Sequence, residues 1–353
     1  MNRDELVQQV RHGEVIAGVD LRDADLRGAD LGGGIFEGVS FAGAHLEGAK
    51  LRECMLLRCS LEGAHLQGAN LRQIVLDQCS LAGADLTGAD LVGLKLNGGG
   101  HAGARFGAGT DLTVAIFLEA DLRGASFVGA RIDRTVFVNA NLGNADFGDT
   151  ALKQCVFLKA DLRTTRFVGT SFDMVIFTEA KLAGQSFTNQ IFRLCQFGDA
   201  DLSGVDFTGA DIVQGNFKGA LLASAKLDRC KADKALFKDA KLTGVSAKDG
   251  RFTMAVFMDA DLSDTNLSGA EMETAIMHRT RCHRASFRGA NLAYADLTHA
   301  DLENADFSGA KLFRTLLHQV KDSGAIFTGR SIARGDDPEL LEAEKFSASR
   351  RAP

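Results

Sequence analysis

The chain contains no tryptophan, one tyrosine and only two prolines in 353 residues. It also lacks an uninterrupted apolar run of about twenty residues, the length that a helix needs to cross a bilayer. The opening sequence, MNRDELVQQVRHGE, has no apolar core of the kind found in a signal peptide. These absences argue against a membrane protein, and they make a cytoplasmic location the first expectation.

A surplus of positive charge is missing as well. The 40 basic and 46 acidic residues give a formal net charge of −6, and both signs are mixed along the chain. Nucleic-acid binding depends on a basic surface that displaces counterions from phosphates. We therefore expect no direct binding to nucleic acid.

What the chain has in abundance is repetition. Phenylalanine recurs at a spacing of twenty residues, at Phe117, Phe137, Phe157, Phe177, Phe197, Phe217, Phe237 and Phe257. A second aromatic series lies ten residues out of step, at Phe127, Phe147, Phe167, Phe187 and Phe207. Leucine follows each phenylalanine of the first series by five residues. A period of twenty built from four fives predicts a chain that winds in four-sided coils, each stacked on the one before. Because each coil contacts only its neighbours, we expect one long repeat domain.

The five-residue period excludes ordinary secondary structure. It would place leucine on every face of a helix with 3.6 residues per turn. An ordinary strand is excluded too, since a two-residue alternation does not divide five. Two residues before each central Leu or Phe stands a small residue, as in Ala24-Asp25-Leu26-Arg27-Gly28. We expect the centre and the small residue to point inward, and the other three positions to face water or form the corner.

This motif resembles the pentapeptide repeat family, whose units have a small residue, then Asp, Asn, Ser or Thr, a central Leu or Phe, any residue, and often Gly. The resemblance covers residues 16–332, nearly the whole chain. It implies an all-β fold, a right-handed quadrilateral parallel β-helix with four pentapeptides per coil.

The two ends of the chain depart from the repeat. Residues 1–15 are expected to hold a short capping helix from Asp4 to Arg11, because acidic residues favour a helix start. Residues 333–353 are expected to form a short helix from Pro338 to Phe346, followed by a loose tail. The fold class is therefore a solenoid, residues 16–332, with short helical caps at both ends.

One irregularity interrupts the solenoid. The centres Phe106 and Leu112 are six residues apart instead of five, within a segment rich in glycine. One added residue predicts a local bulge between residues 101 and 111 rather than a domain boundary. After Leu112 the pattern predicts an unbroken register to a last centre at Ile332.

The same five-residue register explains the cysteines and a glycine motif, which in other proteins often bind metals or cofactors. Six of the seven cysteines occupy the small inward position, namely Cys54, Cys59, Cys79, Cys155, Cys195 and Cys230, while Cys282 occupies a centre. Cysteine there acts as a small apolar residue, and without a CxxC pair we expect no metal site. Residues 98–103 satisfy G-x-G-x-x-G on paper, but no βαβ unit surrounds them, so we expect no cofactor and assign these glycines to the bulge.

Catalysis is not expected either. The histidines do not cluster with carboxylates at a general acid/base spacing, and a filled solenoid offers no concave pocket for a small substrate. We therefore predict no catalytic residues and a protein that is not an enzyme.

One outward face is unusually apolar. The residues beside the central phenylalanines should face water, yet the candidate interface there consists of Ile116, Leu118, Val136, Val138, Val156, Leu158, Ile176, Val256 and Met258. Two explanations are open. β-Branched residues favour strand geometry, or an apolar stripe binds a partner or a second copy of the chain.

A basic cluster is the second local feature. Its arginines, Arg279, Arg281, Arg284 and Arg288, lie around the atypical centres Met277 and Cys282. The cluster would either seat an anionic partner or form a solvated charged face.

The leading hypothesis is a non-catalytic scaffold or adaptor that binds protein partners, with a homodimer as one arrangement. The opening, ELVQQVRHGEVIAGVDLRDADLRGADL, looks like the start of pentapeptide repeat proteins associated with bacterial type VI secretion. The alternative is a modulator of DNA gyrase or topoisomerase of the quinolone-resistance type, because members of that branch resemble duplex DNA in shape and negative charge. A translocated effector is a third possibility. The sequence names neither the partner nor the face that it uses.

Overall fold

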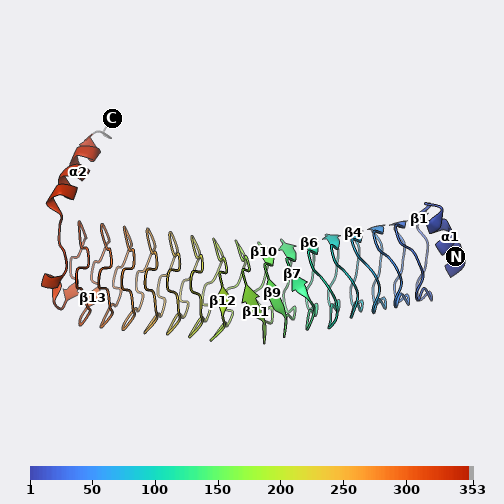
Figure 1. Ribbon diagram of the computed structural model, residues 1–353, viewed down its shortest axis with the longest axis horizontal. Coiled ribbons are helices and arrows are strands. Elements are labelled where there is room, and N and C mark those ends of the chain that lie inside the picture. Colours follow the sequence, from blue (N-terminus) through green and yellow to red (C-terminus); the bar gives the residue numbers. More distant parts are fainter. Residues whose placement is uncertain (350–353) are drawn as a thin grey trace. The chain divides into compact units, whose positions relative to one another are not determined.

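The computed structural model describes residues 1–349, so the end of the predicted loose tail, residues 350–353, lies outside it. The chain divides into two compact units, Met1–Lys181 and the residues from Leu182 onward. Each unit consists of stacked turns that repeat the same backbone path (Figure 1).

The turns are joined by parallel pairing at a constant interval. Asp20 bridges to Ser40, and the pairs that begin at Asp25, Asp30 and Ile35 follow at five-residue intervals. These pairs join equivalent positions of successive turns, so each twenty-residue turn has four sides. The predicted fold class is confirmed: the chain is a parallel β-solenoid of about 16 turns, with short helices near its two ends.

Regular strands in the first unit gather mainly on one side. The eight-stranded parallel sheet contains, in order, β1 (Val15–Ala17), β2 (Ile35–Glu37), β3 (Met55–Leu57), β4 (Val75–Asp77), β5 (Lys95–Asn97), β6 (Ile116–Leu118), β8 (Val136–Val138) and β10 (Val156–Leu158). On another side β9 (Ala151–Lys153) pairs in parallel with both β7 (Ile132–Asp133) and β11 (Ser171–Asp173). Each three-residue strand of the eight-stranded sheet buries its middle residue and turns the two flanking residues outward.

A short helix precedes the first strand. α1 (Arg3–Arg11) begins one residue before the predicted start and has a capping box. The Glu5 N–H donates to Asn2 Oδ1 at 2.9 Å, and the Asn2 N–H donates to Glu5 Oε2 at 3.0 Å. Leu6 and Val10 are buried, so α1 packs its apolar side beside β1.

The second unit is held mostly by isolated parallel bridges. Its short strands are β12 (Phe192–Arg193), β13 (Asp306–Phe307) and β14 (Ile326–Phe327), and β13 pairs with β14. α2 (Pro338–Ser349) begins at the predicted residue and runs three residues beyond the predicted end at Phe346. Neither described helix is long and apolar enough to cross a membrane.

The regular register ends earlier than predicted. Gly329 adopts a left-handed φ of 71°, and the 3-10 helix η1 (Arg330–Ile332) follows it. Leu316 then pairs with Arg334, eighteen residues on instead of twenty. Ile332, expected to be a buried centre, is 52% exposed. That expectation was wrong because residues 330–332 form η1 instead of a further pentapeptide, and the chain returns to its neighbour two residues early.

The pairing register also locates the inserted residue. Asp85 pairs with Arg105 at the usual twenty residues, whereas Asp90 pairs with Asp111 at twenty-one. The extra residue therefore lies in the corner after Phe106. The glycines of residues 98–100 precede this corner, so they are not the site of the insertion.

Buried leucines and stacked aromatic rings fill the axis of each unit. In the first unit the Phe117 and Phe137 rings stack at 4.9 Å between centroids with a 6° interplanar angle, and Phe117 meets Phe127 edge-on at 90°. In the second unit Phe217 and Phe237 stack at 4.9 Å. Both arrangements are favourable for aromatic rings, and the side chains are fully buried. The axis of the described turns is therefore filled, and recognition falls to the outer surface of each unit.

Candidate interaction surface

The first candidate surface lies on three consecutive strands of the first unit, β6, β8 and β10. Ile116, Val136 and Val156 are in register with one another, and Ile176 bridges to Val156 one turn further on. On the other side of the buried centres, Leu118, Val138 and Leu158 form a second row. We name these seven residues the apolar strand face. Ile116 is 39% and Leu118 36% exposed, and the other five are half-buried.

Polar residues border this face. Glu119, Asn139 and Lys159 occupy the corner positions beside the second row, and Lys159 Nζ lies 3.4 Å from Glu179 Oε2. On the other three sides of the same turns the bridging residues are mostly polar, namely Asp111, Arg131, Ser171, Asp121, Asn141, Asp161, Lys181, Ser126, Asp146 and Arg166. An apolar centre with a polar rim is the usual composition of a protein-binding surface.

The preference of β-branched residues for strands does not by itself explain the composition of the apolar strand face. It accounts for Val136, Val138 and Val156, because β-branched residues favour strands. It does not account for Leu118 and Leu158, which are not β-branched and still turn outward in register.

The other two candidate interface residues lie in the second unit. Val256 bridges to Leu236 on one turn and to Ile276 on the next, and Met258 is half-buried beside the Phe257 centre. Lys238 takes the position equivalent to Met258 one turn earlier, and its Nζ lies 3.6 Å from Asp239 Oδ2. The nine predicted residues therefore form two separate groups, one in each unit.

The predicted basic patch is neutralised by aspartates of neighbouring turns. Arg279 Nε lies 2.7 Å from Asp259 Oδ1, and Arg284 binds Asp264 with two contacts of 2.7 Å each. The remaining pairs are Arg281 with Asp261 at 2.9 Å and Arg288 with Asp306 at 2.8 Å. Side-chain hydrogen bonds from Arg279 and Arg284 lower the pKa of Asp259 and of Asp264. The four arginines therefore have aspartate partners, which favours the interpretation as a solvated charged face.

The cysteines lie where the register predicts, and all seven are buried. Burial raises the pKa of Cys54, Cys155 and Cys282 to about 12, so these thiols stay protonated and unreactive at neutral pH. His101, the polar centre near the insertion, is also fully buried, and its Nε2 lies 2.9 Å from the Gly98 carbonyl oxygen.

The structure also brings together three residues that the sequence did not single out. His299 Nε2 lies 2.9 Å from Glu344 Oε1, and His318 Nε2 lies 3.3 Å from Glu344 Oε2. We name these residues the His–Glu cluster. The histidines sit one turn apart, a spacing visible in the sequence. Their carboxylate comes from α2, and its place could not be foreseen before the path of residues 333–337 was known.

Comparison with known proteins identifies the repeat. The family model described as Pentapeptide repeats (8 copies) matches residues 20–56, 58–98, 115–154, 135–173, 145–184, 180–219, 200–239, 240–279, 255–292 and 280–319. No curated protein matches the chain.

Similar solved structures come from several sources. HetL, a pentapeptide repeat protein involved in heterocyst differentiation regulation from the cyanobacterium Nostoc sp. strain PCC 7120, is 24% identical, with 89% of this chain and 96% of HetL covered and a TM-score of 0.29. The plasmid-mediated fluoroquinolone resistance protein QnrB1 is 15% identical, with 73% and 89% covered and a TM-score of 0.27. AT2G44920 from the Arabidopsis thaliana thylakoid lumen is 26% identical, with 35% and 69% covered and a TM-score of 0.23.

TM-scores this low do not indicate a shared function. The family matches, in contrast, extend through both units, from residue 20 to residue 319. Together with the four-sided parallel turns, they show that this chain belongs to the pentapeptide repeat family.

Proposed function

We propose that this protein is a non-catalytic scaffold that binds another protein through the apolar strand face. The observation that carries the proposal is the register of seven apolar side chains on consecutive turns, all directed outward and bordered by polar residues. Contiguous exposed apolar side chains usually mark an interface, because water contact with them is unfavourable.

The expected partner is a protein with a complementary apolar strip. Two rows of side chains on successive strands, about 4.8 Å apart along the stack, offer a flat, ridged surface without a deep pocket. Such a surface suits a sheet or helix face better than a small molecule. The opening segment supports a bacterial, cytoplasmic adaptor linked to type VI secretion, and we include that context in the proposal.

The test compares two pairs of substitutions in the full chain. Val136→Glu with Val156→Glu places two carboxylates in the apolar strand face. Ala151→Glu with Ser171→Glu makes the same charge change on the β9–β11 side, at exposed positions that are also one turn apart. Partners captured from the native cell by the wild type are identified by mass spectrometry and then purified for direct titration.

We expect the first pair to abolish binding and the control pair to leave it unchanged. Circular dichroism checks that both variants fold, and light scattering reports self-association. Equal binding by the wild type and the first pair, with no change in oligomeric state, would refute the proposed surface.

The alternative function, DNA mimicry directed at gyrase, requires negative charge without nearby partners. Four of the described aspartates instead bind the arginine two residues on, as in Asp20 with Arg22 and Asp121 with Arg123, at 2.6 Å in both cases. The interaction scaffold is therefore preferred. A supercoiling assay with purified gyrase separates the two, because inhibition or drug protection would favour the mimic.

A further inference from the structure

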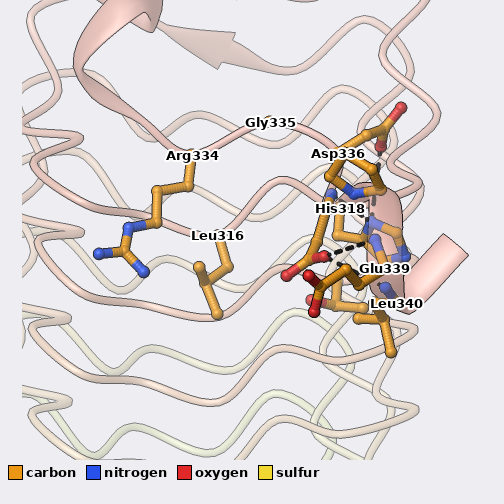
Figure 2. A pocket seen from close by; sticks show the side chains of 10 residues that line it. Leu316, His318, Arg334, Gly335, Asp336, Glu339 and Leu340 are labelled. Atoms are coloured by element: carbon orange, nitrogen blue, oxygen red, sulfur yellow. Dashed lines mark hydrogen bonds and ion pairs between the residues drawn. The ribbon is translucent and has the colours of Figure 1, made fainter.

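The His–Glu cluster lies where the C-terminal segment folds over the last turns of the second unit. His318 follows the buried centre Leu317 and should face outward, yet it is only 3% exposed. Residues 334–340 explain this burial, because together with Thr298, Leu316 and His318 they line a cleft of about 580 Å³ (Figure 2). The Asp337 N–H donates to His318 Nδ1 at 3.1 Å, which fixes the ring.

The other two side chains are positioned by different elements. His299 occupies a corner with a left-handed φ of 60°, and its N–H donates to the His318 carbonyl oxygen at 2.9 Å. Glu344 stands in the second turn of α2, six residues after Pro338. Three separate segments therefore converge on one point.

We propose that His299, His318 and Glu344 form a binding site for a divalent transition metal, with zinc the expected ion. Two imidazole nitrogens and one carboxylate are a ligand set that zinc commonly uses. Calcium and magnesium prefer sites made of oxygen, so this set selects against them.

The distances fit one tetrahedral ion. With metal–ligand bonds near 2.0–2.1 Å, the ligand atoms of a tetrahedral zinc site lie about 3.3 Å apart. His299 Nε2 lies 2.9 Å from Glu344 Oε1 and His318 Nε2 lies 3.3 Å from the other carboxylate oxygen, Oε2, and one ligand atom from each residue lies within 4.8 Å of the other two. Small side-chain rotations would bring them to equal separations.

Metal binding requires a change of tautomer at His318. Binding through His318 Nε2 requires the ring proton to sit on Nδ1, which must then donate rather than accept. Asp336 Oδ1 lies 3.7 Å from Nδ1 and accepts from the Gln319 N–H at 2.8 Å, so the ring would have to move closer to donate to it, as zinc-bound histidines often do to carboxylates. Metal binding would therefore break the hydrogen bond that the Asp337 N–H donates to Nδ1.

The proposed site has a structural consequence. Three protein ligands leave the fourth position of a tetrahedral ion to water or to a group from a partner. Because Glu344 is the one ligand from α2, the metal would fasten this helix to the last turns of the second unit.

The experiment uses the full chain after removal of metal with a chelator. Zinc binding is measured by titration calorimetry, and cobalt, which replaces zinc, reports four-coordinate geometry through its visible absorption. The variants are Glu344→Gln and His299→Ala. Matched controls are Glu342→Gln, on the same helix, and His283→Ala, in a second group with Asp301 and Glu303.

We expect one zinc per chain, a loss of affinity of at least about tenfold in each variant, and unchanged binding in both controls. Zinc should also slow amide hydrogen exchange in residues 338–349 of the wild type and not of Glu344→Gln. The proposal is overturned if the wild type binds no zinc, if both variants bind as the wild type does, or if His283→Ala abolishes binding.

Discussion

The Sγ of Cys54 lies 3.0 Å from the carbonyl oxygen of Leu31, twenty-three residues earlier in the chain. Thr135 occupies the equivalent inward position four turns later, and its Oγ1 donates to the Leu112 carbonyl oxygen at 2.8 Å, again twenty-three residues earlier. Cysteine, a weak donor, and threonine, a strong donor, thus donate to the equivalent carbonyl oxygen in different turns. The small inward position is therefore a hydrogen-bonding position as well as a packing one.

This equivalence predicts the effect of replacing Cys54. Cys54→Thr should keep the bond to Leu31 and change the free energy of unfolding by less than about 0.5–1 kcal/mol. Cys54→Ala loses the donor and leaves a small void, and it should destabilise the protein by about 1 kcal/mol. Urea unfolding of both variants measures the difference. A threonine variant less stable than the alanine variant would contradict the hydrogen-bonding role.

The buried thiols also predict a loss of stability at alkaline pH. The pKa of Cys54 and of Cys155 is about 12 in the folded chain, whereas an unfolded thiol titrates near 9.0. A raised folded pKa means that stability is complete below pH 9 and falls as pH rises toward 12, because only the unfolded state releases the proton. At pH 10 each thiol should cost about 1.4 kcal/mol. The urea midpoint measured from pH 8 to 10 should fall less in Cys54→Thr with Cys155→Thr than in the wild type. If the urea midpoints of the wild type and the double variant fall equally with pH, ionisation of these two thiols is not the cause of the loss of stability.

Two adjacent glycines are expected to respond differently to alanine. Gly99 has a φ of 83°, and a Cβ there would lie 1.9 Å from the Cys79 carbonyl oxygen. Gly99→Ala should therefore cost about 2 kcal/mol or more, through both strain and overlap. A Cβ at Gly100 would meet no atom within 4 Å, so Gly100→Ala should stay within about 0.5 kcal/mol. Thermal unfolding of the two variants measures the difference. Equal melting temperatures would contradict the predicted overlap between a Cβ at residue 99 and the Cys79 carbonyl oxygen.

The five-residue pattern was sufficient to predict the fold because each position repeats the same environment. Phe117 and Phe137 stack as their spacing requires, and the six-residue step after Phe106 predicted an added residue. What the pattern could not supply is the conformation of a single corner. Ile332 keeps the right spacing from Phe327, yet it lies in the 3-10 helix η1, where the last turn is shortened, and it is exposed.

The surface features were harder to predict than the core. The arginines at 279 and 284 looked like a basic patch when the sequence around them was considered alone. Their partners Asp259 and Asp264 lie twenty residues earlier, on the preceding turn, and become neighbours only through the stacking. The His–Glu cluster depends further on where α2 lies, because Glu344 is 45 residues from His299. Side-chain pairs that follow the period are predictable in principle, whereas contacts made by the end segments are not.

The paired arginines predict weak binding to polyanions. Wild-type protein should leave a heparin column at low salt, because Asp259 and Asp264 neutralise Arg279 and Arg284. Asp259→Asn with Asp264→Asn removes this compensation and should raise the salt concentration at elution.

A control pair separates local from global charge. Asp199→Asn with Asp249→Asn changes the net charge equally, in the same unit, at aspartates outside the described ion pairs of Arg279 and Arg284. It should have a smaller effect on elution. Equal shifts for the two pairs would show that net charge alone governs binding and that the pairing has no role.

Deletion of Ala108 tests the origin of the twenty-one-residue turn. Ala108 is exposed in the corner that carries the extra residue, and its removal leaves Phe106 and Leu112 separated by a standard pentapeptide. The shortened corner keeps Thr110 in the small inward position, so the free energy of unfolding should change by less than about 1 kcal/mol.

Deletion of Thr87, in the equivalent corner one turn earlier, instead removes a residue from a regular turn. It shifts the inward positions off their neighbours on the next turn, so it should lower the melting temperature sharply or prevent folding. If both deletions are equally harmful, the added residue is required by the fold and is not a tolerated insertion.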